Sequence, residues 1–278
     1  MTGPRVLRLP ANTLGRDWVI GDVHGAFDLV EQAMLAVGFR ADADRLICVG
    51  DLVDRGRDSA RVEQFLRLPY VYAVRGNHDH LVATTDPRVL QAMALSDFNG
   101  MHWMLGVSDR QLGSIQQALG DLPYAIEIAS ADGSEPTGII HAQVPENWSW
   151  PDLTEVLSDW PEDDVLFDDV MNSRYKFDYA IESRVTGVKR VFAGHCICWN
   201  GPRILGNTVF ADTGAVFTGR EQGASLTIID LLASDAQIEA IGMDGSHPGL
   251  RICRANDEFE FEFEDAPNTS PYERSRQK

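Results

Sequence analysis

The segment GDLVDRG, residues 50–56, directly follows the apolar run LICV of residues 46–49, which predicts a buried strand. It places two aspartates and one arginine between glycines at the end of that strand. Turns are ordinarily rich in Asp and Gly, so turn chemistry alone accounts for this composition. The alternative is that Asp51, Asp54 and Arg55 form one corner of a reaction site.

Two other segments repeat this order of apolar strand and polar loop. Residues 18–20 run into GDVHG (21–25), and residues 71–74 run into RGNHD (75–79). Apolar residues at helical spacing follow the first two loops. This alternation predicts an α/β fold with a largely parallel sheet. Because ligands bind at the carboxyl ends of such strands, we expect the three loops to meet at one site.

The middle of the chain combines a helical insertion with further strands. Residues 86–122 look helical but less regular, and they predict an inserted cap. Apolar, strand-like runs then return and lead to His141, His195 and Asp212. These strand ends extend the pattern of the first three loops into the second half of the chain.

Length and composition indicate one globular unit. The chain has 278 residues, of which 44% are hydrophobic, enough for one substantial core. We expect a single domain over residues 1–265. Within it the EFEFEFE run, residues 258–264, alternates with period two and is compatible with an edge strand or a contact with a partner. Residues 266–278 predict a disordered tail.

Charge and hydropathy exclude several classes of function. The net charge of −18 argues against a nucleic-acid-binding surface, but it is compatible with a small anionic substrate in a locally positive cleft. No stretch reaches the roughly 18 apolar residues of a membrane span, and the start lacks a signal-peptide pattern, so we expect a cytoplasmic protein without a membrane partner. The four cysteines do not form a disulfide framework, which favours reduced thiols.

Five strand ends carry side chains of the kind that bind metals. They are Asp22 and His24, Asp51 and Asp54, Asn77 and His78, His141, and His195. Any one of them is weak support, because a lone histidine after a strand is more often packed or solvated. Together, carboxylate, imidazole and amide oxygen suit a divalent metal such as Mn²⁺, Fe²⁺ or Zn²⁺. Two such metals sharing a carboxylate would lie roughly 3.5 to 4 Å apart.

The order of these segments resembles a known family. GDVHG, GDLVDRG and RGNHD are similar to the GD-x-HG, GD-x-x-DRG and GNH-[ED] blocks of the PPP-type metallophosphoesterases. IIHAQVP, VTGVKRVFAGH and VFADTGAVFTGR resemble the bacterial and phage branch of the serine/threonine protein phosphatases. The resemblance spans about residues 17–230. It implies the calcineurin-like fold, in which two mixed β-sheets pack together and are flanked by helices, here with the helical cap.

The resemblance also implies a role for each candidate residue. The implied metal ligands are Asp22 and His24 for one metal, Asp51 as the bridge, and Asn77, His141 and His195 for the second metal. His78 would be the general acid, kept cationic by Asp54. The implied phosphate-binding residues are Arg55, Arg75 and Arg174. The family pattern favours two Mn²⁺ ions, with Fe, Zn or Ni as alternatives.

The implied function is that of a metal-dependent phosphoesterase, specifically a serine/threonine phosphoprotein phosphatase. A metal-bridging hydroxide would attack phosphorus directly, without a phosphoenzyme. One alternative is the hydrolysis of dinucleoside polyphosphates or other small phosphate esters, and another is a catalytically silent protein that binds phospho-ligands. The sequence names neither the physiological substrate, nor the native metal, nor the oligomeric state.

Two departures from the family pattern bear on the site. The third block ends in Asp79, where many relatives carry glutamate, so this loop is expected to be held differently. Cys196-Ile197-Cys198 follows His195 in place of Thr-Pro. Either a thiol lies near the second metal or both cysteines simply pack, and the packed arrangement is favoured.

Overall fold

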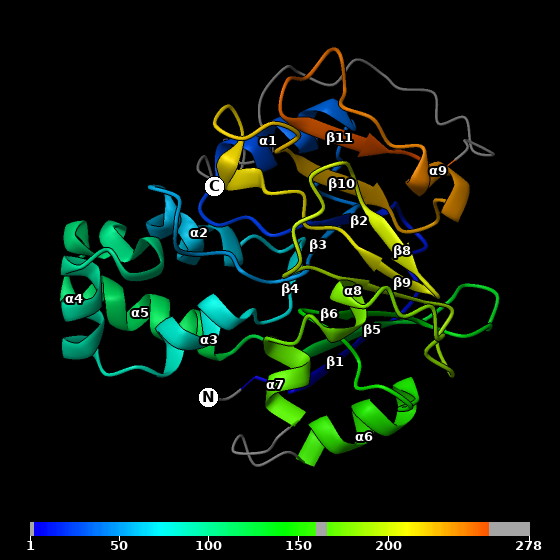
Figure 1. Ribbon diagram of the computed structural model, residues 1–278, viewed down its shortest axis with the longest axis horizontal. Helices are drawn as coiled ribbons and strands as arrows, with labels where there is room; N and C mark the ends of the chain where they lie inside the picture. Colours follow the sequence, from blue (N-terminus) through cyan, green and yellow to red (C-terminus); the bar gives the residue numbers. More distant parts are fainter. Residues whose placement is uncertain (1–2, 160–165, 256–278) are drawn as a thin grey trace.

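The computed structural model describes residues 3–159 and 166–255, and its strands form two sheets that lie one above the other (Figure 1). The first sheet has the strand order β1 (Val6–Leu9), β5 (Ala125–Ile128), β6 (Thr137–Ile140), β7 (Arg190–Ala193), β9 (Thr208–Phe210) and β8 (Arg203–Leu205). The second has the order β11 (Leu250–Cys253), β10 (Leu226–Asp230), β2 (Asp17–Ile20), β3 (Arg45–Cys48) and β4 (Val71–Ala73). The predicted EFEFEFE strand and the tail from residue 266 lie outside the described residues.

Each sheet contains a parallel run that ends at the site. Strands β2, β3 and β4 pair in parallel, as do β6, β7 and β9. Antiparallel pairs join β10 to β2, β5 to β6, and β8 to β9. Both sheets are therefore mixed, as the family resemblance implied.

Side chains alternate between two apolar layers along each central strand. In β2, Trp18 and Ile20 face the outer layer, whereas Val19 lies in the core between the two sheets. Both faces of these strands are buried, which explains why their sequences are continuously apolar and do not alternate with polar residues. The strands are thus fixed between two cores, and the loops at their ends have rigid supports.

Helices cover the outer face of each sheet (Figure 1). Helices α1 (Phe27–Ala36) and α2 (Val62–Leu66) pack on the second sheet, while α6 (Trp150–Asp159) and α7 (Leu166–Met171) pack on the first. The shorter elements are α8 (Tyr175–Asp178), α9 (Asp235–Glu239) and the 3₁₀ helices η1 (Ser59–Arg61) and η3 (Ala215–Phe217). Among the described residues, no helix is long and apolar enough to cross a membrane.

The insertion predicted for residues 86–122 is helical and lies to one side of the sheets (Figure 1). After α3 (Asn77–Thr84) it consists of α4 (Pro87–Leu95), the 3₁₀ segment η2 (Phe98–Gly106) and α5 (Asp109–Gly120). Its helices begin at side-chain caps: Asp86 accepts from the Arg88 N–H, and Ser108 from the Gln111 N–H. We refer to residues 86–122 as the cap.

Candidate metal centre

The loops after the parallel strands of both sheets meet at one place, and their backbones are strained there. His24, Asp51, Asp54, Arg55 and His195 all have positive φ, which is rare for residues other than glycine. Such strain is concentrated at functional sites, where the surrounding structure holds it. The loops also pack very closely: a Cβ on Gly194 would lie 2.0 Å from an oxygen of Asp22.

Asp51 lies at the centre of the cluster. One of its carboxylate oxygens is 3.5 Å from Nε2 of His24, and the other is 3.5 Å from Nε2 of His141. The second oxygen also accepts the backbone N–H of His78 at 2.9 Å. Two groups of side chains share this aspartate and bring candidate ligand atoms within 4.8 Å of one another, namely His24, Asp51 and His78, and Asp51, His141 and His195. A carboxylate between two imidazole groups has the placement required of a bridge.

The two histidines beside Asp51 are oriented by backbone carbonyls. Nδ1 of His24 donates to Val53 O at 2.7 Å, and Nδ1 of His141 donates to Val49 O at 2.9 Å. Because a carbonyl only accepts, the proton lies on Nδ1 and the Nε2 lone pair faces Asp51. Burial lowers the pKa of His24 to about 3 and also lowers that of His141. Both rings are therefore neutral, which is the form that binds metals.

Asn77 and His195 complete the side of the site next to His141. The Asn77 side-chain oxygen is 3.0 Å from Nε2 of His141. His195 donates from Nε2 to Asn172 O at 2.8 Å, which leaves Nδ1 as its free ring nitrogen. Burial and the neighbouring His141 lower the pKa of His195 to about 4.

Asp22 belongs to the cluster through its backbone contacts and its neighbouring carboxyl group. It accepts the backbone N–H of His195 at 3.0 Å, and it lies beside Asp212, to which no role was assigned from the sequence. Burial, reinforced by Asp51, raises the pKa of Asp212 to about 6, and burial and Asp212 raise that of Asp22. The carboxyl groups of Asp22, Asp51 and Asp212 are all buried close together and repel one another when ionised. Bound cations would relieve this repulsion. The position of Asp212 at a strand end was the signal for it in the sequence.

His78 and Asp54 form a buried pair beside Asp51. Nδ1 of His78 donates to one Asp54 oxygen at 2.8 Å. Burial disfavours the charged imidazole, but Asp51 and Asp54 outweigh it, and the pKa of His78 is raised. Arg55 donates to Nε2 of His78 at 3.0 Å and also contacts Nε2 of His24. The hydrogen bond from Arg55 to His78 needs an unprotonated Nε2 on His78. Protonation of His78 therefore requires Arg55 to move away.

The three arginines predicted to bind phosphate lie in different surroundings. Arg55 reaches into the cluster from an exposed position. Arg174 lies on the loop whose Asn172 contacts His195, but its guanidinium is 3.7 Å from Asp178 and half-exposed. Arg75 is buried, and the structure shows its guanidinium in contact with the end of the cap.

The contacts of Arg75 lie at the end of the cap. Its guanidinium donates to Leu122 O at 3.0 Å, to Gly120 O, and to the Tyr124 hydroxyl at 3.0 Å, and it stacks 4.7 Å from the Tyr124 ring centroid. These hydrogen bonds engage both terminal nitrogens of the guanidinium. Arg75 thus joins the cap to the sheet, and its role in phosphate binding stays a prediction.

The two departures from the family pattern have simple structural outcomes. Asp79 is fully buried, and its oxygens accept the N–H groups of Leu52 and Gly76, each at 2.9 Å. It therefore ties the GDLVDRG loop to the RGNHD loop. Cys196 and Cys198 are buried in the core under the first sheet, and burial raises the pKa of Cys196 to about 12. Both cysteines therefore pack in this core.

The fold and the site together define a metallophosphoesterase: two mixed sheets bring together two groups of candidate metal ligands that share Asp51, and the buried His78–Asp54 pair and Arg55 adjoin that aspartate. Residues 16–205 match the model of the calcineurin-like phosphoesterase family, and the chain belongs to this family.

Relatives of this chain carry two kinds of name. It is 28% identical to serine/threonine-protein phosphatase 1 of Salmonella typhimurium, over 77% of this chain and 93% of that protein. It is 27% identical to serine/threonine-protein phosphatase 2 of Escherichia coli K12, over 79% and 97%. Symmetrical bis(5'-nucleosyl)-tetraphosphatase of Serratia proteamaculans is 45% identical, over 24% of each chain.

The fold is also found among solved structures. A crystal structure provisionally described as a diadenosine tetraphosphatase superposes with a TM-score of 0.56 at 23% identity, covering 82% of this chain and 94% of that one. At this identity the likeness shows the shared fold alone.

Proposed function

We propose that this phosphoesterase is a phosphoprotein phosphatase acting on phosphoserine and phosphothreonine. The observation that carries the proposal is the extent of the similarity to the bacterial proteins of that name. The alignments span 93% and 97% of those two proteins, so the similarity extends far beyond the short metal-binding blocks. Segments outside a shared catalytic core determine substrate choice.

The residues around Asp51 are proposed to hold two divalent cations. Asp22, His24 and Asp51 would bind one, and Asp51, Asn77, His141 and His195 the other. The neutral Nε2 atoms facing Asp51 and the adjoining carboxyl groups fit such cations. When bound, the cations supply Lewis acidity and lower the pKa of a bound water. The mixed oxygen and nitrogen donor set supports Mn²⁺, with Fe, Zn and Ni as alternatives.

His78 is proposed as the general acid. Its Nδ1 is engaged by Asp54, so its Nε2 is the atom that can deliver a proton to the departing serine or threonine oxygen. The raised pKa of His78 keeps the ring protonated closer to neutral pH. Arg55, which now contacts this Nε2, would turn to the phosphate oxygens and so release His78 for proton transfer.

Hydrolysis of dinucleoside polyphosphates is the second candidate function. The tetraphosphatase of Serratia proteamaculans supports it with a higher identity, 45%, but over only a quarter of either chain. The two candidates share the metal site and differ in what must fit around it. An extended phosphopeptide needs an open surface beside the metals, whereas a dinucleotide needs base-binding pockets.

A substrate panel separates these functions. The Mn²⁺-loaded protein would be given a phosphoserine peptide, diadenosine tetraphosphate and an aryl phosphate, with His78→Asn as the control for each. We expect the phosphopeptide to give the highest kcat/KM. A higher kcat/KM for diadenosine tetraphosphate would overturn the proposal in favour of the second candidate. Binding of the phosphopeptide without any hydrolysis would indicate a catalytically silent protein.

A further inference from the structure

A side chain from the cap directly contacts the buried pair formed by His78 and Asp54. The indole N–H of Trp103, in η2, donates to Asp54 Oδ1 at 2.9 Å, while Asp54 Oδ2 accepts from Nδ1 of His78 at 2.8 Å. Asp54 is fully buried, and Trp103 is 9% exposed. Within residues 3–159 and 166–255, these two rings are the side chains that hydrogen-bond the Asp54 carboxylate. One oxygen is therefore held by the cap and the other holds His78.

The two hydrogen bonds hold the Asp54 carboxylate in one orientation. Rotation of the Asp54 carboxyl group about its Cβ–Cγ bond would break both hydrogen bonds, so the Trp103 bond fixes the oxygen that aligns His78. Removal of the indole N–H would leave a charged oxygen buried without a partner, which is costly. The carboxylate would then relax by rotating or by taking up a proton, and either change releases His78 from its alignment.

Trp103 is itself held firmly in the cap. It belongs to the outer core together with its neighbours Met101 and Met104. Next to it, Gly100 O accepts the backbone N–H of Arg55 at 2.9 Å, and a Cβ on Gly100 would lie 2.4 Å from Arg55 Cα. The cap therefore contacts the GDLVDRG loop without any intervening space at this point.

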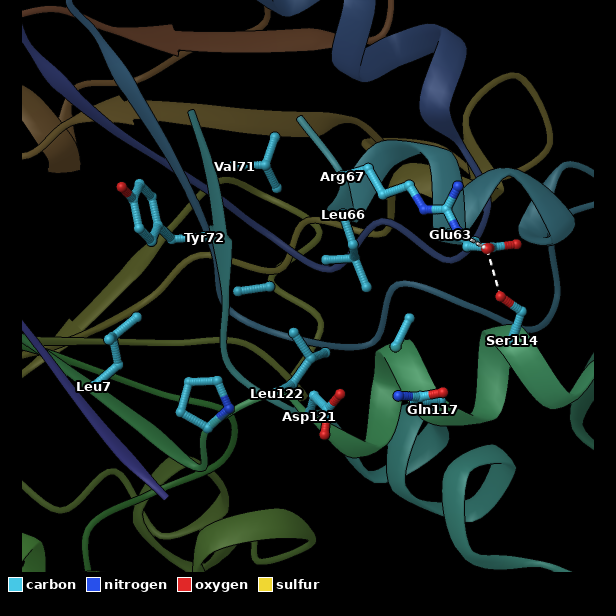
Figure 2. Close-up of a pocket in the computed structure, with 13 residues that line it drawn as sticks. Leu7, Glu63, Leu66, Arg67, Val71, Tyr72, Ser114, Gln117, Asp121 and Leu122 are labelled. Carbon is cyan, nitrogen blue, oxygen red and sulfur yellow. Dashed lines mark hydrogen bonds and ion pairs between the residues drawn. The ribbon is translucent and has the colours of Figure 1, made fainter. Parts of the chain in front are cut away.

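The other side of the cap makes looser contact with the sheet. Figure 2 shows α5 facing β4 and α2 across a cavity of about 430 Å³, lined among others by Leu66, Tyr72 and Leu122. The contact drawn across it is the hydrogen bond from Ser114 to Glu63, which also pairs with Arg67. The cap is thus packed tightly at Trp103 and Gly100 and more openly behind α5.

We propose that Trp103 is a positioning residue for catalysis, which acts from the cap through Asp54 to align His78 for proton transfer to the leaving group. The inference rests on the proposed role of His78 as the general acid. It gives the cap a part in the chemical step, in addition to any part in substrate binding. It also predicts that Trp103 raises kcat more for a substrate whose leaving group must be protonated than for one whose leaving group departs without a proton.

The test uses Trp103→Phe, which keeps an aromatic ring but removes the N–H donor. A matched control is Trp150→Phe, because Trp150 is also buried and its indole donates to Glu127 at the same distance of 2.9 Å, under the first sheet. Both variants lose one indole–carboxylate hydrogen bond. Only Trp103→Phe is expected to slow the chemistry.

Two substrates distinguish a positioning role from a structural one. On a phosphoserine peptide, whose alkoxide must be protonated to leave, Trp103→Phe should lower kcat by about 10- to 100-fold with little change in KM, as expected for a misaligned catalytic group. On p-nitrophenyl phosphate, whose leaving group departs without a proton, the loss should stay below about 3-fold. Trp150→Phe should change neither kcat. Equal losses on both substrates, or equal losses in both variants, would overturn the inference.

Asp54→Asn supplies the second readout. If Trp103 acts through Asp54, adding Trp103→Phe to Asp54→Asn should lower kcat on the phosphopeptide less than about 2-fold further. Multiplicative losses would contradict the inference. Should Trp103→Phe fail to fold, genetically encoded 3-benzothienylalanine at position 103 retains the shape of indole and lacks the donor. His78→Asn separates the two proposals. If His78→Asn leaves kcat unchanged, the proposed role of His78 as the general acid fails. If His78→Asn lowers kcat strongly but Trp103→Phe does not lower it, only the inference about Trp103 is refuted.

Discussion

Replacing Asp79 with asparagine should weaken both the fold and the metal site. The Asp79 carboxylate accepts two backbone N–H groups, from Leu52 and Gly76, each at 2.9 Å in a fully buried position. An asparagine amide offers one oxygen and one NH₂ group, so one of these N–H groups would face another donor. Burial, together with the neighbouring Asp51, raises the pKa of Asp79 to about 7, so this acceptor is not fully ionised near neutral pH. The loss of one hydrogen bond, with a buried backbone donor left unsatisfied, predicts a decrease of about 1 to 3 kcal/mol in the free energy of unfolding.

The assay is urea unfolding in excess chelator, so that metal binding does not contribute. A matched control is Asp44→Asn, because Asp44 accepts the backbone N–H groups of Arg16 and Arg40, each at 2.8 Å, away from the site. Both variants should lose similar stability. Only Asp79→Asn should also weaken metal binding, by about 10- to 100-fold, because Asp79 joins the loops that carry Asp51 and Asn77.

Two results would refute this reasoning. A change in the free energy of unfolding below about 0.5 kcal/mol would show that the two Asp79 hydrogen bonds do not hold the loops. Equal metal affinities in Asp79→Asn and in the control would show that the link between the loops does not shape the site.

Three further predictions concern the acid, the arginines and the metals. His78→Asn should retain full metal content and lower kcat on the phosphopeptide by about 10²- to 10⁴-fold, and an unchanged kcat would remove His78 from the mechanism. Arg75→Met should lower the free energy of unfolding by about 2 to 4 kcal/mol, because buried carbonyls lose their donor. Arg55→Met should raise KM for the phosphopeptide and leave the free energy of unfolding close to that of the wild type. The reverse pattern would indicate that Arg75, and not Arg55, binds the phosphate. Metal removal by chelator should lower Tm, because bound cations stabilise the folded state by about 2.7 kcal/mol per site at 100 times their Kd. An unchanged Tm would contradict a metal site built from three buried carboxyl groups.

The parts of the fold that could be predicted are those whose signal is local. Strands β2, β3 and β4 are short and continuously apolar because both of their faces are buried, and each runs directly into a polar loop. Strands such as β1 and β5 gave no comparable signal. Their sequences, VLRL and AIEI, mix apolar and charged residues, and they pair with each other across more than a hundred positions.

The site shows the same division between local and distant information. The blocks that carry Asp51, His78 and His141 are recognisable along the sequence, and the structure brings these residues together. Arg75 belongs to such a block, yet its partners are carbonyls and a tyrosine 45 to 49 positions away, at the end of the cap. Nothing near Arg75 in the sequence indicates these contacts.

Trp103 is the clearest case of a residue that the sequence could not assign. The cap was predicted as a helical insertion, but the contact of Trp103 with Asp54 joins positions 49 residues apart. It depends on η2 being turned toward the GDLVDRG loop, where positive φ at Asn99 and Gly100 reverses the backbone. Such turns follow from packing of the whole cap and leave no local pattern.

The central claim is that one aspartate serves two metals, and metal content tests it most directly. Calorimetric titration with Mn²⁺ and elemental analysis would be performed on the wild-type protein and on Asp51→Asn. Since Asp51 lies 3.5 Å from Nε2 of both His24 and His141, we expect two Mn²⁺ ions per wild-type chain and weaker binding at both sites in the variant. Two fully occupied sites in Asp51→Asn, or weakening confined to one site, would contradict the account.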